Sequence, residues 1–187
     1  PLFAPFLGTE NPAGAAAGTV PERSQVPECD RWNLEAIYPS AEAWEAAFAD
    51  LGPRVAALAD HAGHLGEGPG ALLAYLRAEE AVALELGKLY VYANMKSHED
   101  LRVTRPMEMA ARVETLATRH GAVCAFFRPE VLSIPEGDLR RWIAEDEGLK
   151  LYDFHLSEIL RERAHVLSPA EEELLARTRE LSAVPEN

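Results

Sequence analysis

The sequence lacks most of the short motifs that mark a reactive site. Its 187 residues include only two cysteines, Cys29 and Cys124, which lie far apart. Two such cysteines form no disulfide framework, so we expect a reducing compartment, the cytoplasm. The chain has no P-loop, no G-x-S-x-G turn, no C-x-x-C pair and no H-E-x-x-H motif. The familiar sequence markers of phosphate binding, nucleophilic catalysis and zinc proteolysis are therefore missing.

Long hydrophobic runs are also missing. No uninterrupted apolar segment is long enough to cross a bilayer, so we expect no membrane association. The first 28 residues lack a basic region followed by a solid apolar core, which makes them a poor signal peptide. They are rich in proline, glycine and alanine, which predicts an extended or poorly ordered N-terminal arm over residues 1–29.

Positive charge is scarce. The chain carries 31 acidic and 18 basic residues, for a formal net charge of −13. This balance argues against a nucleic-acid partner, because phosphate binding requires local positive charge. Residues 88–128, with seven bases and four acids, are the only net-positive part. This segment is either an ordinary solvated face or a surface for an acidic neighbour or a peptide carboxylate.

Strong helix formers dominate what is present. Alanine, leucine, glutamate and arginine are abundant, and apolar residues recur at helical spacing, which predicts an all-α, multi-helix bundle over residues 30–187. Ser40 is expected to cap a helix that kinks or breaks at Gly52–Pro53. A long helix is expected from Pro69 to about residue 97, with Tyr90 on its buried face. Thr104 is expected to cap the next helix.

Further boundaries follow from proline and capping chemistry. The helix after Thr104 should stop at Arg128–Pro129, because the residue before proline disfavours helix. Ser133 and Glu136 have the spacing of a capping box and predict a brief helix that Gly148 ends. A last helix in this part is predicted over residues 149–163.

The corner around His165 places a lone histidine between arginines and a run of glutamates. Ser168 and Glu171 form a second capping-box pattern, with Pro169 at the first helical position. Arginines precede His165 and glutamates follow Pro169, which matches the charge that two helix ends favour. We therefore interpret this corner as structural rather than catalytic or metal-binding.

Two histidine-containing clusters are candidate sites. His61 and His64 are three residues apart beside Asp60, a spacing that two metal ligands on a helix can use. The glycines around them indicate a fraying helix end instead. His98 and its two acidic neighbours, residues 99 and 100, fall in a polar connection between helices, where desolvated acid–base groups are uncommon.

The isolated histidines and the tyrosines can be interpreted either as site residues or as structural residues. His120 lies on a mostly apolar helical face and is interpreted as a core or boundary residue, and His155 is expected to face solvent or a helix neighbour. Tyr75, Tyr90 and Tyr92 either line a peptide groove or belong to the core.

Three stretches of the chain, taken together, resemble one enzyme family. They begin WNLEAIYPS, KLYVYANMKSHED and LKLYDFHLSEIL, and they fall at residues 32–48, 88–139 and 149–176. Their order is similar to that in the N-terminal part of oligoendopeptidase F, a zinc metallopeptidase family related to thimet oligopeptidase. The resemblance covers residues 30–182, and the segments at 127–132 and 161–172 are its most specific parts.

The resemblance implies a cytoplasmic, largely helical enzyme with two lobes around a deep cleft. Such enzymes cleave short peptides rather than folded proteins. Their zinc is held by the two histidines of an H-E-x-x-H helix and a later glutamate, in a C-terminal catalytic region expected beyond Asn187. No residue of this sequence inherits a catalytic, cofactor-binding or metal-binding role, so we expect a fragment that is inactive alone. Its implied partners are that catalytic region and short peptides.

Three functions remain open at this point. The chain is a non-catalytic lobe that walls the substrate cleft and limits substrate size, a stand-alone helical module that binds a protein or peptide, or a metal-binding protein that uses His61 and His64. An exposed contiguous apolar patch would favour the lobe, and a compact site with a polar rim would favour the module.

Overall fold

A computed structural model of the protein describes residues 22–163, which form α-helices and short 3-10 helices and include no β-strand. The predicted all-α class is therefore confirmed. The α-helices are α1 (Ala41–Ala57), α2 (Pro69–Glu99), α3 (Thr104–Val123), α4 (Phe127–Ser133), α5 (Glu136–Glu145), α6 (Glu147–Lys150) and α7 (Asp153–Glu162). The 3-10 helices are η1 (Arg23–Gln25), η2 (Glu28–Asp30), η3 (Leu34–Ala36), η4 (Leu58–His61), η5 (Leu65–Glu67) and η6 (Cys124–Phe126).

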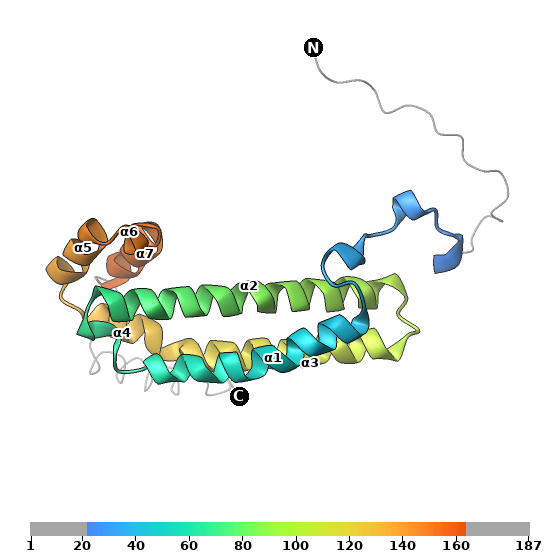
Figure 1. The fold of residues 1–187 in the computed structure, drawn as a ribbon, viewed down its shortest axis with the longest axis horizontal. Helices are drawn as coiled ribbons and strands as arrows, with labels where there is room; N and C mark the ends of the chain where they lie inside the picture. The colour runs from blue at the N-terminus through green and yellow to red at the C-terminus, as the bar shows by residue number, and fades with distance from the viewer. Residues whose placement is uncertain (1–21, 164–187) are drawn as a thin grey trace, which may run out of the picture.

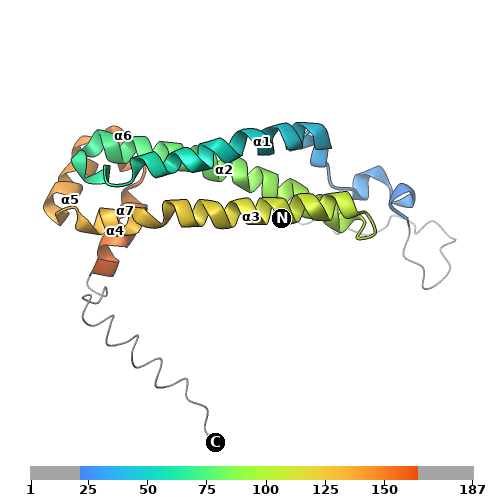
Figure 2. The same cartoon turned by 90° about the horizontal axis from the view of Figure 1, so that it is seen from below.

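The long helix α2 organises the molecule. It runs along nearly the whole elongated body, with α1 and α3 on one side of it (Figure 1). The view turned by 90° shows α1 and α3 running along the same length of the body (Figure 2). The short helices α4 to α7 gather at the N-terminal end of α2. None of the helices described is long and apolar enough to span a membrane.

Two hydrophobic clusters share α2. The first joins α1, α2 and α3, and its α2 members are Val82, Leu86, Leu89, Tyr92 and Ala93. The second joins the start of α2 to η5 and the helices α4 to α7, and its α2 members are Leu72, Tyr75 and Leu76. Because one continuous helix enters both clusters, neither end of the molecule packs independently of the other.

Two predicted helix starts are confirmed. The Ser40 hydroxyl accepts a hydrogen bond from the Ala43 N–H at 3.2 Å, so it caps α1. Pro69 is the first residue of α2, where its missing N–H forfeits no hydrogen bond. Gly68 precedes it with φ of +154°, a conformation that side-chain-bearing residues rarely adopt.

Of the kink or break expected at Gly52–Pro53, the break is wrong, because α1 continues through Pro53 to Ala57. Leu51 and Val55, on either side of the proline, are fully buried in the first cluster. Packing of this apolar face holds the helix together despite the hydrogen bond that proline cannot donate.

The end of α2 expected near residue 97 is confirmed, because α2 ends at Glu99. The expected burial of Tyr90 on this helix is wrong. Tyr90 is 43% exposed, whereas Tyr92 lies in the core at 4%. Thr104 is the first residue of α3 rather than its cap, and Val103 precedes it without a capping side chain.

The predicted stop at Arg128–Pro129 is also wrong. A short 3-10 turn follows α3, and α4 then begins at Phe127 and runs to Ser133. Pro129 falls in the first turn of α4, where backbone N–H groups have no partner within the helix, so the proline is tolerated there.

The predicted capping box at Ser133 and Glu136 does not form. Ser133 is the last residue of α4, and its hydroxyl donates to the Glu130 carbonyl at 2.6 Å. Pro135 precedes α5 instead, with no capping side chain. The serine is occupied by the preceding helix and is unavailable to the next one.

The helix predicted over residues 149–163 is two helices, α6 and α7. The Asp146 carboxylate accepts from the N–H groups of Gly148 and Leu149 at 2.8 and 3.2 Å, which starts α6 earlier than expected. Gly148, expected to end the previous helix, therefore lies inside α6. A turn at Leu151 then redirects the chain, so that apolar residues of α7 enter the second cluster.

Other expectations fall wholly or partly outside the described residues. The corner with His165, Ser168, Pro169 and Glu171 is outside them, as are the first 21 residues of the predicted arm 1–29. Residues 22–29 are described, and they contain η1 and the start of η2 rather than a wholly extended arm. The boundary at residue 30 stays a prediction.

Candidate functional site

The acidic end of α2 and the connection after it form an ion-pair network, and His98 and Glu99, which were expected in the connection, lie in the last turn of α2. The Glu99 carboxylate pairs with Arg23 from the N-terminal segment and with Lys96 at 2.8 Å. Asp100 pairs with Arg102 at 2.7 Å. A side-chain hydrogen bond from Arg102, followed by a backbone one, lowers the pKa of Asp100 to about 2. A carboxylate held this strongly in its charged form is poorly suited to proton transfer near neutral pH.

The same network fixes the N-terminal segment to the end of α2. Arg102 also donates to both carboxylate oxygens of Glu22, at 2.5 and 3.0 Å. Together with His98, which is exposed, these residues line a hollow of about 370 Å³. Its charges are paired with one another, which supports the interpretation of this loop as structural.

The histidines of the DHAGH stretch do not converge. The Nδ1 atom of His64 lies 2.6 Å from the Glu67 carboxylate, which raises the pKa of this exposed histidine. His61 instead packs edge-on against Tyr75, with 5.7 Å between ring centroids. Within residues 22–163, no group of three or more His, Cys, Asp or Glu side chains is arranged to hold a metal ion.

A second set of candidate residues does converge, in a cavity of about 270 Å³ between α2, the η6–α4 segment and α7. We call it the aromatic pocket, and its defining residues are Tyr75, Glu79, Cys124, Phe127, Tyr152 and His155. Tyr75 and His155, which the sequence analysis considered separately, therefore belong to one site.

Ring contacts form one wall of the aromatic pocket. Tyr75 stacks on Phe127 with centroids 5.1 Å apart, and Phe127 stacks on His155 at 5.7 Å with nearly parallel planes. Phe126 meets Tyr75 edge-on at 5.3 Å. Tyr75 is only 1% exposed and lies at the bottom, whereas His155 is at the exposed rim.

Negative charge borders these rings. The Tyr152 hydroxyl donates to the Glu80 carboxylate at 2.6 Å, and this bond is the main cause that raises the pKa of Tyr152. Burial is the main cause that raises the pKa of Tyr75 and of the Cys124 thiol, and the charge of Glu79 adds to both. A thiol shifted in this direction is a weak nucleophile.

His120 lies behind the pocket rather than in it. Its side chain is 16% exposed, and its Nε2 atom lies 3.4 Å from the Glu79 carboxylate without forming a hydrogen bond. This placement agrees with the interpretation of His120 as a boundary residue.

Sequence reasoning missed four of the six residues that define this site. Glu79, Cys124, Phe127 and Tyr152 were not identified as site residues, because they come from segments whose approach is decided by the α4 and α6–α7 turns. Of the three tyrosines considered for a groove, only Tyr75 contributes. The pair of aromatic residues at 126–127, two residues after Cys124, is the one signal that pointed to this region.

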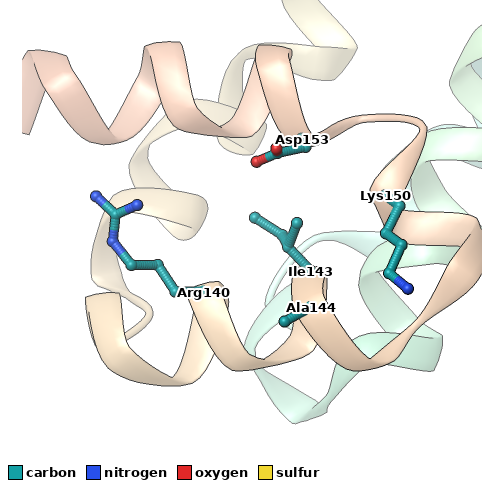
Figure 3. A pocket seen from close by; sticks show the side chains of 5 residues that line it. All are labelled: Arg140, Ile143, Ala144, Lys150 and Asp153. Carbon is teal, nitrogen blue, oxygen red and sulfur yellow. The ribbon is translucent and has the colours of Figure 1, made fainter.

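Another hollow, of about 340 Å³, lies between α5, α6 and α7 (Figure 3). Its floor is Ile143, with Arg140, Lys150 and Asp153 around it. Arg140 pairs with Glu136, and Lys150 pairs with the acidic residue at position 147. Its charged groups thus bind their own helical neighbours.

The net-positive segment 88–128 is not a free basic surface. Six of its seven basic residues pair with carboxylates in the described structure: Lys88, Lys96, Arg102, Arg105, Arg112 and Arg128. This observation supports the solvated-face interpretation of the segment.

Comparisons with known proteins identify the family. A family model described as Oligopeptidase F matches residues 130–187. Oligopeptidase PepF of Bacillus subtilis (strain 168) is 38% identical over 165 residues, which are 88% of this chain and 25% of that protein. The plasmid oligoendopeptidase F of Lactococcus lactis subsp. cremoris is 32% identical over 164 residues, 87% of this chain and 27% of that protein. This chain belongs to the oligoendopeptidase F family.

Solved structures agree with this assignment. The crystal structure of oligoendopeptidase-F from Enterococcus faecium matches with a TM-score of 0.61 and 26% identity, over 76% of this chain and 28% of that one. A Chlamydophila abortus protein matches in fold, with a TM-score of 0.74 and 23% identity over 86% of this chain and 27% of that one. The chain therefore spans about a quarter of the length of the curated relatives it matches.

The outer side of α2 in this oligoendopeptidase F chain carries exposed apolar residues. Leu84 is 62% exposed and Val91 is 44% exposed, and their spacing of seven residues places them on one side of the helix. Tyr90 adjoins them at 43%. The ribbon shows this middle part of α2 packed against α1 and α3 on one side only (Figure 1). We call Leu84, Tyr90 and Val91 the α2 stripe.

Proposed function

We propose that this chain is the N-terminal, non-catalytic lobe of an oligoendopeptidase F-like zinc metalloendopeptidase that cleaves short peptides. The observation that carries the proposal is its 38% identity to a peptidase of which it matches only a quarter. The other three quarters of such a protein would hold the catalytic region, which is the partner we propose for this lobe. With two free cysteines and no disulfide among the described residues, a cytoplasmic location is part of the same proposal.

The mechanical role we propose is to wall the substrate cleft and limit substrate size. The α2 stripe supports this role, because exposed apolar residues on a rigid helix are typical of a surface that a further part of the molecule covers. The layer of α1, α2 and α3 supplies the rigidity. A wall of this kind would admit an extended short peptide, exclude a folded chain and help to expel water from the site.

Zinc belongs to the proposed catalytic region rather than to this chain. The donor groups within residues 22–163 do not fit a zinc site, since the candidate histidines point to Glu67 and Tyr75. In this proposal, these residues therefore carry out no step of peptide hydrolysis. The purified chain should not hydrolyse a short fluorogenic peptide when zinc is added. Chelator-sensitive turnover that co-purifies with the chain would overturn the proposal.

A chimera tests the role of the lobe. In it, this chain replaces the matching quarter of the Bacillus subtilis relative. We expect the chimera to cleave a short peptide but not a folded protein, and we expect the relative with that quarter deleted to lose peptide cleavage or size discrimination. Substituting Leu84→Glu and Val91→Glu should impair cleavage of the short peptide by the chimera. Substituting Thr115→Glu, on the exposed face of α3, should leave this cleavage unchanged. Unchanged size discrimination after the deletion would contradict the proposal.

A stand-alone peptide-binding module is the alternative function. The aromatic pocket is the observation in its favour, because it is concave and combines apolar walls with a polar rim. Retention of peptide binding by the isolated chain, together with failure of the chimera, would favour this alternative.

A further inference from the structure

We propose that the aromatic pocket binds the arginine side chain of a peptide ligand. The inference concerns this chain alone and does not depend on the proposed peptidase function. It rests on three features of the pocket: its shape, its aromatic wall and the carboxylate of Glu79. The cavity of about 270 Å³ has room for one long side chain, with Tyr75 and Leu76 buried at the bottom and His155 exposed at the rim.

The exposed end of the aromatic wall, His155, suits a planar cation, because Phe127 is stacked between two other rings and Tyr75 is buried. Tyr75, Phe127 and His155 form a continuous stack, with centroid distances of 5.1 and 5.7 Å. A guanidinium group is planar and weakly hydrated, so it lies against aromatic faces more readily than an ammonium group does. The aliphatic stem of an arginine would meanwhile cover the apolar floor near Leu76.

The carboxylate of Glu79 supplies the complementary charge. Its side chain is 32% exposed, and no lysine or arginine of the described segment lies within 4.0 Å of it. His120 on α3 places its Nε2 atom 3.4 Å from the Glu79 carboxylate, which is an ion pair when the histidine is protonated. Outside the pocket lining, the Glu80 carboxylate accepts the Tyr152 hydroxyl, and the charge of Arg77 opposes that of Glu80 at Tyr152. Glu79 is therefore the acid that a cationic side chain in the pocket would meet.

Other occupants fit these features less well. A purely apolar side chain would fill the floor but would desolvate Glu79 without pairing it, which is unfavourable. A lysine would pair with Glu79 but would present a compact, strongly hydrated ammonium to the rings. Arginine combines the stacking plane, the bidentate donors and the apolar stem.

An NMR titration of the full chain tests the proposal. The probes are acetyl-Gly-Arg-Gly-amide and the same peptide with citrulline, which keeps the shape of arginine but carries no charge. We expect the arginine peptide to shift the backbone amides near Tyr75, Glu79 and His155, and its affinity to fall as salt is added. The citrulline peptide should bind about tenfold more weakly or not at all.

Two variants and a matched control locate the site. Glu79→Gln removes the charge and should weaken binding of the arginine peptide by about tenfold. His155→Ala removes a rim ring without touching the buried floor, and should weaken it severalfold. Glu114→Gln, an exposed acid on α3 outside the pocket, should change nothing. A thermal unfolding curve for each variant confirms that the fold is intact.

Several results would overturn the inference. Equal affinity for the arginine and citrulline peptides would show that the pocket does not select a cation. Shifts confined to residues outside the pocket would place the binding elsewhere. Shifts that depend on protein concentration without peptide would show that a second copy of the chain, rather than a peptide, occupies the pocket.

Discussion

At the scale of single residues, Gly148 is the position where a side chain is least tolerable. A Cβ atom built there would lie 2.6 Å from a methyl carbon of Leu73 and 3.0 Å from a guanidinium nitrogen of Arg77. The absence of a side chain therefore lets α6 approach α2 closely. No pattern in the sequence distinguishes this glycine from those in turns.

We predict that Gly148→Ala destabilises the fold by about 1–3 kcal/mol, because the packed end of the Leu73 side chain or α6 itself must shift to admit the new methyl group. The matched control is Gly87→Ala in the interior of α2, where nothing lies within 4 Å of the new Cβ. That change should stabilise the fold by about 0.5–1 kcal/mol, since alanine is the better helix former. Urea unfolding measures both, and a stabilising Gly148→Ala would refute the close-approach argument.

The stability of the fold should depend on pH through Asp100. Its pKa is lowered from 3.8 to about 2 by Arg102. A group whose pKa is lower in the folded state stabilises the fold above its unfolded pKa, and this contribution disappears as the pH falls through the folded value. The stabilisation should therefore be complete above about pH 4 and lost between about pH 4 and 2.

The ¹³Cγ resonance of Asp100 measures this directly and should titrate near pH 2. In Arg102→Gln the midpoint should return towards 3.8, the ordinary value. A substitution that removes the charge of the exposed, more distant Arg119 should leave the titration midpoint of Asp100 unchanged. An Asp100 midpoint near 3.8 in the unmodified protein would show that the pair does not form in solution.

At the scale of elements, the effect of a proline depends on its position in the helix. Local rules predict that proline is tolerated in the first turn, whereas inside a helix packing can override its tendency to break the helix. Pro69 begins α2 and Pro129 lies in the first turn of α4, and both are tolerated because those N–H groups have no helical partner. Pro53 is different, because it lies inside α1. Burial of the helix face around it compensates for the missing hydrogen bond.

We predict that Pro53→Ala stabilises the protein by about 1–3 kcal/mol, because it restores a helical hydrogen bond at an exposed position. Greater freedom of the unfolded chain offsets part of this gain. The control is Pro69→Ala, which restores no hydrogen bond and should be neutral or slightly destabilising. Thermal and urea unfolding compare the two. Equal effects would mean that helix position does not decide the outcome.

At the scale of the whole molecule, α2 couples the two hydrophobic clusters. Leu139 of α5 is fully buried in the second cluster, far along the chain from α1. We predict that Leu139→Ala costs about 2–5 kcal/mol. Because α2 is shared, amide exchange in the most protected part of α1 should accelerate together with that in α5.

The matched control is Leu151→Ala, because Leu151 is 82% exposed. It should change stability by less than about 0.5 kcal/mol. Faster exchange confined to α4–α7 in Leu139→Ala would show two independent folding units, which would contradict the role of α2.

Composition and apolar spacing alone determined the all-α class, the start of α2 at Pro69 and the cap at Ser40. These depend on backbone chemistry within a few residues, so they can be read locally. The ordered similarity of three segments also determined the family. The sequence thus carried both the local helix signals and the ancestry of the chain.

Only the tertiary structure decided the rest. The continuity of α1 through Pro53, the exposure of Tyr90 and the use of Ser133 by the preceding helix each depend on which face packs against a neighbour. The aromatic pocket is the clearest case, since Glu79 on α2 and His155 on α7 are 76 residues apart in the chain. Such residues meet only because hydrophobic burial around α2 brings distant segments together, and helical periodicity contains no information about that approach.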